Sequence, residues 1–342
     1  MAATTQRIFI KNLQPGDRID GVYCVTDCAL GKARNDSLYL RCQVGDRTGF
    51  VNARKWDMDE AHFRDLPTSG IVRVTGEAET YNNKTQVLIR SIEPHDATQE
   101  ELADLIPTSA RDIDEMFADL RGLIDTGVRH PFMRALADAY FADDRLMAAF
   151  KRSPAANSLH HAYIGGLLEH TLTLVRLATL VCPVYPKVNA EIVVLGLLIH
   201  DLGKTVELTA GVGFPYTDRG QLVGHIVDGA IILRKKVQEA FAASKIKPPV
   251  GLVTVLEHVV LSHHGKPEFG AAKIPATPEA LLVSMLDNLD AKMFMALTAT
   301  RPDDAGVMND AVFTDRLWAL DNVKFYRPDP LASGDNGSDS EG

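Results

Sequence analysis

The segment that most constrains the fold is residues 195–204, which read LGLLIHDLGK. Every residue of the run 192–199 is apolar, so a helix here would be hydrophobic on all sides and would belong inside a helical core. His200 and Asp201 follow at its end, where Gly203 can close the helix with a positive φ. Burying two uncompensated polar groups is costly. The segment therefore predicts either a polar pair capping a core helix or part of a metal site, because imidazole and carboxylate bind divalent ions.

Four other predicted helices place a metal-ligand residue type on the face that helical periodicity assigns to the core. These residues are His170, His225, His263 and Asp287. A single histidine on an apolar face is usually a hydrogen-bonded core residue. Together with the helix before His200, five helices would each need a separate buried partner, whereas one metal centre would satisfy all of them.

Before residue 97 the hydrophobic pattern has period two, and turn residues separate its short segments. Segments rich in Val, Ile, Thr, Tyr and Phe with this period predict β-strands. The expected strands are residues 21–29, 37–44, 48–56, 71–79 and 85–92. Five short strands in about 75 residues predict a small closed or nearly closed barrel, for which the oligonucleotide-binding (OB) fold is a common solution.

One face of the predicted third strand combines aromatic and basic side chains, because Val51 and Ala53 would point inward and their neighbours outward. Residues on the second and fourth strands extend this outer face. Single-stranded nucleic acid binds such surfaces, since bases stack on rings and cations follow the phosphates. The alternative is a second small apolar core packed on the other domain. The predicted nucleic-acid-binding residues are Tyr39, Arg41, Phe50, Arg54, Trp56 and Arg73.

The net charge of −9 over 342 residues does not exclude a nucleic-acid partner. Residues 1–96 carry 13 basic and 13 acidic side chains, so the whole negative excess lies in the rest of the chain. The longest apolar run has 8 residues, far short of the roughly 20 needed to cross a bilayer. The N-terminus lacks the pattern of a signal peptide. We therefore expect a cytoplasmic protein without a membrane partner.

Five motifs taken together carry a family resemblance. HHAYIGGLLEHTL (160–172), GLLIHDLGK (196–204), GHI (224–226), LSHHG (261–265) and PEALLVSMLDNLDAKM (278–293) follow the order H…HD…H…HH…D of the HD-domain metal-dependent phosphohydrolases. Up to about Arg327 the chain resembles the YhaM-type 3′-to-5′ exoribonucleases, which join an N-terminal OB domain to an HD domain. VNARKWD (51–57) is the best-matching part of the barrel.

The resemblance implies a pair of divalent ions. His170, His200, Asp201 and Asp287 would hold one ion, and Asp201 would bridge to a second held by His225 and by His263, His264 or both. Mixed nitrogen and oxygen ligands suit Mn²⁺, Fe²⁺, Co²⁺ or Zn²⁺, whereas so many histidines suit Mg²⁺ less well. Mn²⁺ is the expected ion, with the others as alternatives.

Two residues are the implied catalytic groups. Asp201 would share the two ions that activate a water for attack on phosphorus, and Lys204 would neutralise the phosphate oxygens. Without the resemblance, Lys204 reads equally well as a solvated lysine beside a helix end. His160 and His161 could contact the substrate.

The expected fold is multidomain, an N-terminal five-stranded OB-type barrel followed by an all-α HD domain. The expected parts are an OB domain (1–96), a helical linker (97–150), an HD domain (151–328) and a disordered acidic tail (329–342), since the tail has the Gly/Ser/Asp composition of segments that do not order. Whether the protein forms a homo-oligomer stays open.

The expected function is metal-dependent 3′-to-5′ exonucleolytic cleavage of single-stranded RNA, with single-stranded DNA as a further candidate and the barrel delivering the strand. One alternative is an HD phosphohydrolase of nucleotides or cyclic dinucleotides. Another is a nucleic-acid-binding protein with a purely structural HD domain. After His264 the chain reads GKPEFGAAKIP, without the glycine-tyrosine-proline signature of cyclic dinucleotide phosphodiesterases, which disfavours that substrate.

Overall fold

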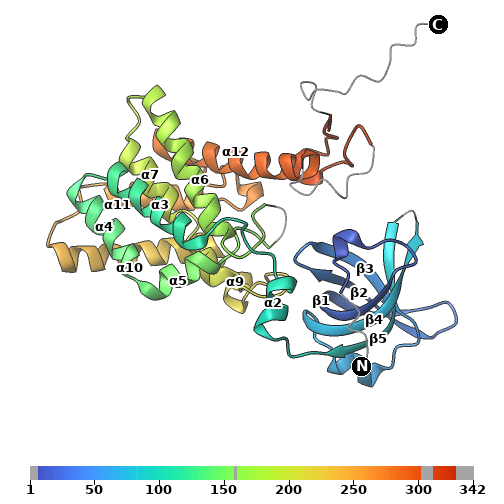
Figure 1. Ribbon diagram of the computed structural model, residues 1–342. Helices are drawn as coiled ribbons and strands as arrows, with labels where there is room; N and C mark the ends of the chain where they lie inside the picture. The colour runs from blue at the N-terminus through green and yellow to red at the C-terminus, as the bar shows by residue number, and fades with distance from the viewer. Residues whose placement is uncertain (1–6, 83, 158–159, 302–310, 329–342) are drawn as a thin grey trace, which may run out of the picture. The chain divides into compact units, whose positions relative to one another are not determined.

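The computed structural model describes residues 7–82, 84–157, 160–301 and 311–328 (Figure 1). The chain forms two compact units, Met1–Ala291 and Lys292–Gly342. The predicted tail, 329–342, lies outside the described residues. In the second unit, residues 311–328 contain a 3₁₀ turn at Trp318–Leu320 and two isolated antiparallel bridges, Phe313 with Tyr326 and Leu317 with Val323.

The first part of the larger unit is a closed barrel with strand order β1-β2-β3-β5-β4, which confirms the OB-type prediction (Figure 1). Only the β3–β5 pairing is parallel among these neighbours. The strands are β1 (Arg18–Lys32), β2 (Leu38–Asp46), β3 (Gly49–Lys55), β4 (Gly70–Tyr81) and β5 (Lys84–Pro94), with the helix α1 (Glu60–Asp65) between β3 and β4.

Side-chain alternation explains how the barrel closes. On β4, Val72 and Val74 are buried in the interior while Arg73 between them is exposed, as expected for strands with one solvated face. Buried residues of the other strands complete one continuous interior, which includes Tyr23, Leu40 and Val87. Each predicted strand overlaps an observed strand and differs by no more than three residues at either end.

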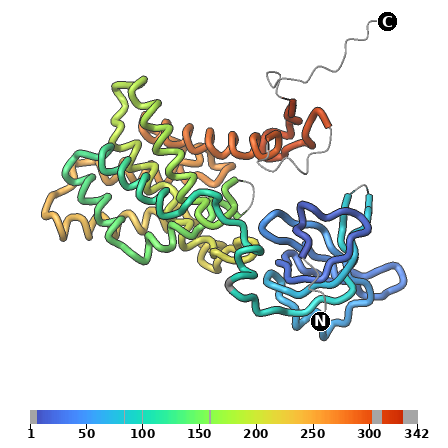
Figure 2. Tube along the Cα trace, viewed as in Figure 1, coloured from blue at the N-terminus to red at the C-terminus, as the bar shows by residue number. Residues whose placement is uncertain are grey.

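The rest of the larger unit is helical (Figure 2). Its helices are α2 (Gln99–Leu105), α3 (Ile113–Gly127), α4 (Pro131–Phe141), α5 (Asp144–Arg152), α6 (Gly166–Val181), α7 (Ala190–Ile199), α8 (Lys204–Glu207), α9 (Asp218–Leu222), α10 (His225–Ser244), α11 (Leu252–Ser262) and α12 (Pro278–Thr300), whose last residues belong to the second unit. The predicted linker, 97–150, is thus helical. The boundaries between the predicted OB domain, linker and HD domain stay predictions.

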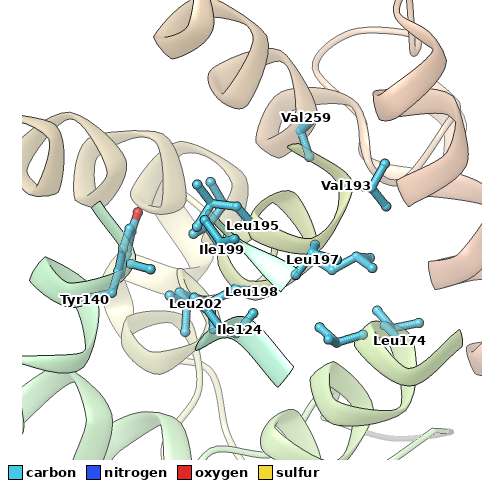
Figure 3. Close-up of a cluster of buried hydrophobic side chains, with 14 of the residues drawn as sticks. Ile124, Tyr140, Leu174, Val193, Leu195, Leu197, Leu198, Ile199, Leu202 and Val259 are labelled. Atoms are coloured by element: carbon cyan, nitrogen blue, oxygen red, sulfur yellow. The ribbon is translucent and has the colours of Figure 1, made fainter. Parts of the chain in front are cut away.

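The apolar helix α7 lies inside the helical core (Figure 3). Leu195 and Leu197 are fully buried, and they share one cluster with Leu174 of α6 and Val259 of α11. Helices α3, α4 and α5 contribute to the same cluster, for example through Ile124 of α3. Because α7 is hydrophobic on every side, its C-terminal end is carried deep into the protein, and the polar residues that follow it are buried.

One described helical stretch, Gly166–Val184, is long and apolar enough by length and composition to cross a membrane. Half of its apolar window is buried inside the fold. A core helix passes the same test, and this one carries the buried polar residue His170.

Candidate functional site

All seven predicted metal ligands lie together at one centre in the helical region. They form two groups, and in each group the possible ligand atoms lie within 4.8 Å of one another. One group, called position 1 below, is His170 of α6, His200 after α7 and Asp287 of α12. The other, position 2, is Asp201, His225 at the start of α10, and His263 and His264 after α11.

Asp201 connects the two positions. Its Oδ2 lies 3.3 Å from Nε2 of His200, while its Oδ1 lies 3.3 Å from Nε2 of His263 and 3.5 Å from Nε2 of His225. The side chain is almost completely buried. A carboxylate placed in this way can offer one oxygen to each of two ions, which fits the predicted bridging role.

The histidines are oriented through their Nδ1 atoms. Three of them donate to backbone carbonyls: His200 to Leu197 at 2.8 Å, His263 to Val260 at 2.8 Å, and His264 to Phe269 at 2.7 Å. A neutral imidazole that donates through Nδ1 presents a lone pair at Nε2. This is the usual arrangement behind a histidine that binds a metal.

Four buried Nε2 atoms and one buried carboxylate oxygen have no hydrogen-bond partner. Among the described residues they are those of His170, His200, His225 and His263 and Oδ1 of Asp201. Leaving so many buried polar atoms unsatisfied would cost several kcal/mol in total, at about 1–3 kcal/mol each. Divalent ions at the two positions would accept these lone pairs, so the donor set fits a metal centre.

Helix ends bring these residues together. His200 and His263 follow the C-terminal ends of α7 and α11, where the helix dipole favours a cation. Helix α11 ends at Ser262 and Gly265 has a φ of 78°, so the chain turns and both adjacent histidines reach position 2. The predicted positive φ at Gly203 is wrong, because its φ is −61°.

Glycine is required at residue 203 for a different reason. A Cβ at this position would lie 1.9 Å from the carbonyl oxygen of His225. The main chain just after Asp201 therefore touches the first turn of α10 directly. This contact places the HD pair next to His225.

Neighbouring charges set the protonation of the metal-free centre. Burial alone would raise the pKa of Asp201, but Lys204, whose Nζ lies 2.6 Å from Oδ2, and His200 hold that pKa well below its usual range. Burial would lower the pKa of His170, but the neighbouring carboxylates of Asp287 and Asp290 raise it to about 9. The carboxylates are thus ionised, as a metal site requires.

Two carboxylates at this centre are not among the predicted site residues. Asp290 of α12 lies with its Oδ2 2.7 Å from Nδ1 of His170, and Glu207 of α8 lies 2.9 Å from Nδ1 of His225. Asp290 had a detectable signal, because it follows Asp287 by three residues on the same helix face. Glu207 had none, since it lies in a short polar segment without periodicity.

The histidines before α6 lie close to His170. His161 is buried, and its Nε2 lies 3.0 Å from Oδ2 of Asp290, while its Nδ1 lies 2.7 Å from the hydroxyl of Tyr163. The rings of His160 and His170 are 6.0 Å apart. This places His161 behind the predicted metal ligand His170, and the substrate contact of His160 stays a prediction.

On the barrel, several predicted nucleic-acid-binding residues form a cluster. The rings of Tyr39 and Trp56 are 5.1 Å apart, and the guanidinium of Arg54 lies 5.8 Å from the centre of the Tyr39 ring. Arg54 also lies 4.8 Å from the centre of the Tyr81 ring. Tyr81, at the end of β4, was missed because nothing in its segment places it beside β3.

Three predicted barrel residues remain: Phe50, Arg41 and Arg73. Phe50 on β3 is 41% exposed, and its ring covers Gly45 of β2. Arg41 is exposed on β2. Arg73 is not brought to the cluster: it lies eight residues before Tyr81 on β4, opposite Val22 of β1 and Glu93 of β5, and its guanidinium donates to Asp20 at 2.8 Å.

Comparison with known proteins gives one matching family and several relatives. The HD domain family matches residues 167–292. A protein of Geobacillus sp. (strain WCH70) named 3′-5′ exoribonuclease YhaM is 31% identical over 93% of this chain and 94% of its own length. The protein of the same name from Bacillus subtilis (strain 168) is 30% identical over 92% of this chain and 96% of its own.

One solved structure, of a replication protein A heterotrimer bound to single-stranded DNA, has a chain that is 18% identical. The match covers 30% of this chain and 76% of that chain, with a TM-score of 0.21. A likeness this low supports no conclusion about the barrel.

Proposed function

This chain belongs to the YhaM family of 3′-5′ exoribonucleases, and we propose that its barrel holds single-stranded RNA while the HD centre removes nucleotides from the 3′ end. It is a metal-dependent hydrolase. The observation that carries the proposal is the set of buried, unpartnered Nε2 and Oδ1 atoms around Asp201, because bound cations would satisfy them together.

We infer two divalent ions, with Mn²⁺ as the first candidate. Position 1 would be held by His170, His200 and Asp287, and position 2 by His225, His263 and His264, with Asp201 shared. When bound, such a pair supplies Lewis acidity toward the phosphate and a nucleophile made from water at neutral pH. The Nδ1 hydrogen bonds of the histidines and the ionised carboxylates described above suit this role.

Lys204 would act on the phosphate and on Asp201. Its ammonium lies 2.6 Å from Oδ2 of Asp201, and the residue is 8% exposed. A buried cation at this place offsets the negative charge that a phosphodiester brings into the centre. It also orients the Asp201 carboxylate, so that Oδ1 stays directed toward position 2.

The barrel cluster would bind the strand behind the cleaved bond. Tyr39, Trp56 and Tyr81 offer rings for base stacking, and Arg54 lies among them. Stacking on rings needs no particular base, so the barrel would accept most sequences.

The test is a time course with 5′-labelled single-stranded RNA and Mn²⁺. We expect a ladder of progressively shorter labelled products, no cleavage of the same RNA in circular form, and no products with EDTA. Asp201→Asn is the inactive control. Cleavage of the circular RNA, or turnover of mononucleotides without shortening of the strand, would contradict exonucleolytic action.

A further inference from the structure

The histidines of the two metal positions are supported in two different ways. His200, His263 and His264 are each held by a backbone carbonyl. His170 and His225 are instead held by carboxylates, Asp290 at 2.7 Å and Glu207 at 2.9 Å. Each position therefore contains one histidine supported by an acid, and the two acids come from different helices, α12 and α8.

We propose that Asp290 and Glu207 are positioning residues that separately set the metal affinity of position 1 and position 2. A carboxylate that accepts from Nδ1 fixes the ring and makes its Nε2 a stronger ligand, and losing such a partner typically weakens metal binding about 10–100-fold. A backbone carbonyl cannot be removed by substitution, so these acids are the places where each position can be weakened without touching a ligand.

Asp290 is itself held in place by a chain of contacts. Its Oδ2 is shared between His170 and His161, and His161 meets the hydroxyl of Tyr163. That hydroxyl donates to Glu169 at 3.0 Å, and Ser109 donates to the same carboxylate oxygen at 2.7 Å. The chain of contacts runs from position 1 to the segment before α3.

Glu207 is held differently. Its Oε1 accepts the backbone N–H of His225 at 3.0 Å, so one carboxylate binds both the main chain and the ring of the same ligand. Because Glu207 touches only position 2 and Asp290 only position 1 through these bonds, the effects of removing them should be separable.

The test is calorimetric titration of the metal-free full-length chain with Mn²⁺, together with counting of the bound ions. Asp290→Asn and Glu207→Gln keep the side-chain shape. The matched ligand variants are Asp287→Asn for position 1 and His225→Ala for position 2. We expect Asp290→Asn to weaken, about 10–100-fold, the binding step that Asp287→Asn removes, and Glu207→Gln to weaken the step that His225→Ala removes.

Wild-type affinity for both ions in Asp290→Asn, or equal weakening of both steps, would overturn the proposal. If Asp290→Asn does not fold, Tyr163→Phe replaces it, because it loosens Asp290 indirectly and should give a smaller loss in the same step. The inference rests on the metal centre alone. RNA shortening is measured separately. Unchanged metal affinities would therefore contradict the role of Asp290 and Glu207 without contradicting the nuclease proposal, and absence of RNA shortening would contradict the nuclease proposal alone.

Discussion

Arg41 of β2 and Arg54 of β3 are direct cross-strand partners in the barrel. Residues opposite each other in an antiparallel pair lie on the same face, and like charges in this arrangement destabilise the sheet. The Tyr39 and Tyr81 rings next to Arg54 offset part of this cost. A phosphate bound between the two guanidinium groups would remove the rest.

The arginine pair should therefore determine how RNA binding depends on salt. Replacing both with Gln is expected to lower the slope of log affinity against log salt by about 0.7 for each phosphate that the barrel no longer neutralises. The measurement is fluorescence anisotropy of a labelled single-stranded RNA at several salt concentrations. Arg73→Gln is the control, since Arg73 is paired with Asp20. If Arg73→Gln changed the slope as much as the double variant does, the assignment of phosphate binding to Arg41 and Arg54 would be refuted.

Base stacking on Trp56 should be visible directly. The chain has two tryptophans, Trp56 and Trp318, so Trp318→Phe leaves Trp56 as the only indole. We expect RNA to quench its fluorescence, and Trp56→Ala to weaken binding by roughly 1–3 kcal/mol for the base it stacks. Hydrolysis of a small phosphodiester should be unchanged in Trp56→Ala; an equal loss on both substrates would mean that the ring supports the fold.

Asp201 and Lys204 should separate activity from stability. Asp201→Asn removes the carboxylate shared by both positions, and hydrolysis should fall to background. It also leaves the Lys204 ammonium buried without its partner, which costs about 3–5 kcal/mol. The double variant Asp201→Asn, Lys204→Met should recover stability in urea unfolding but no activity. Activity in either variant would argue against the shared-carboxylate mechanism.

The metal-free protein should lose stability as pH rises. His170 has a folded pKa of about 9, above its ordinary 6.5, so its contribution is complete below pH 6.5 and disappears as pH approaches and passes 9. A shift of this size corresponds to about 3 kcal/mol. Urea unfolding in EDTA at pH 6.5 and pH 9 measures it. With Mn²⁺ the trend should reverse, because the ion requires the neutral imidazole; a flat metal-free profile would count against this account.

Sequence periodicity predicted the parts of the fold that depend on local pattern. Alternation located all five strands, and the all-round apolar run predicted that α7 is buried with His200 and Asp201 at its end. Ligand residues on helix faces could be found because each must point toward the core. The contacts between segments could not be found in this way, since nothing local to Glu207 or Tyr81 indicates His225 or Arg54 as a neighbour.

The error at Gly203 has the same origin. A glycine after a helix usually indicates a left-handed residue, but here the side chain is excluded by a main-chain atom from a helix more than twenty residues away. Arg73 was placed with the other arginines because strand order cannot be deduced from alternation. In the barrel β4 is separated from β3 by β5, and it is the Tyr81 end of β4, not Arg73, that lies beside Arg54.

The contact between Gly203 and the His225 carbonyl also bears on redesign. Main chain meets main chain there with no space for a methyl group, so the spacing between Asp201 and His225 is a property of the scaffold rather than of any side chain. Exchanging ligand types, for example an aspartate for His264, would then retune metal preference within a frame of unchanged dimensions.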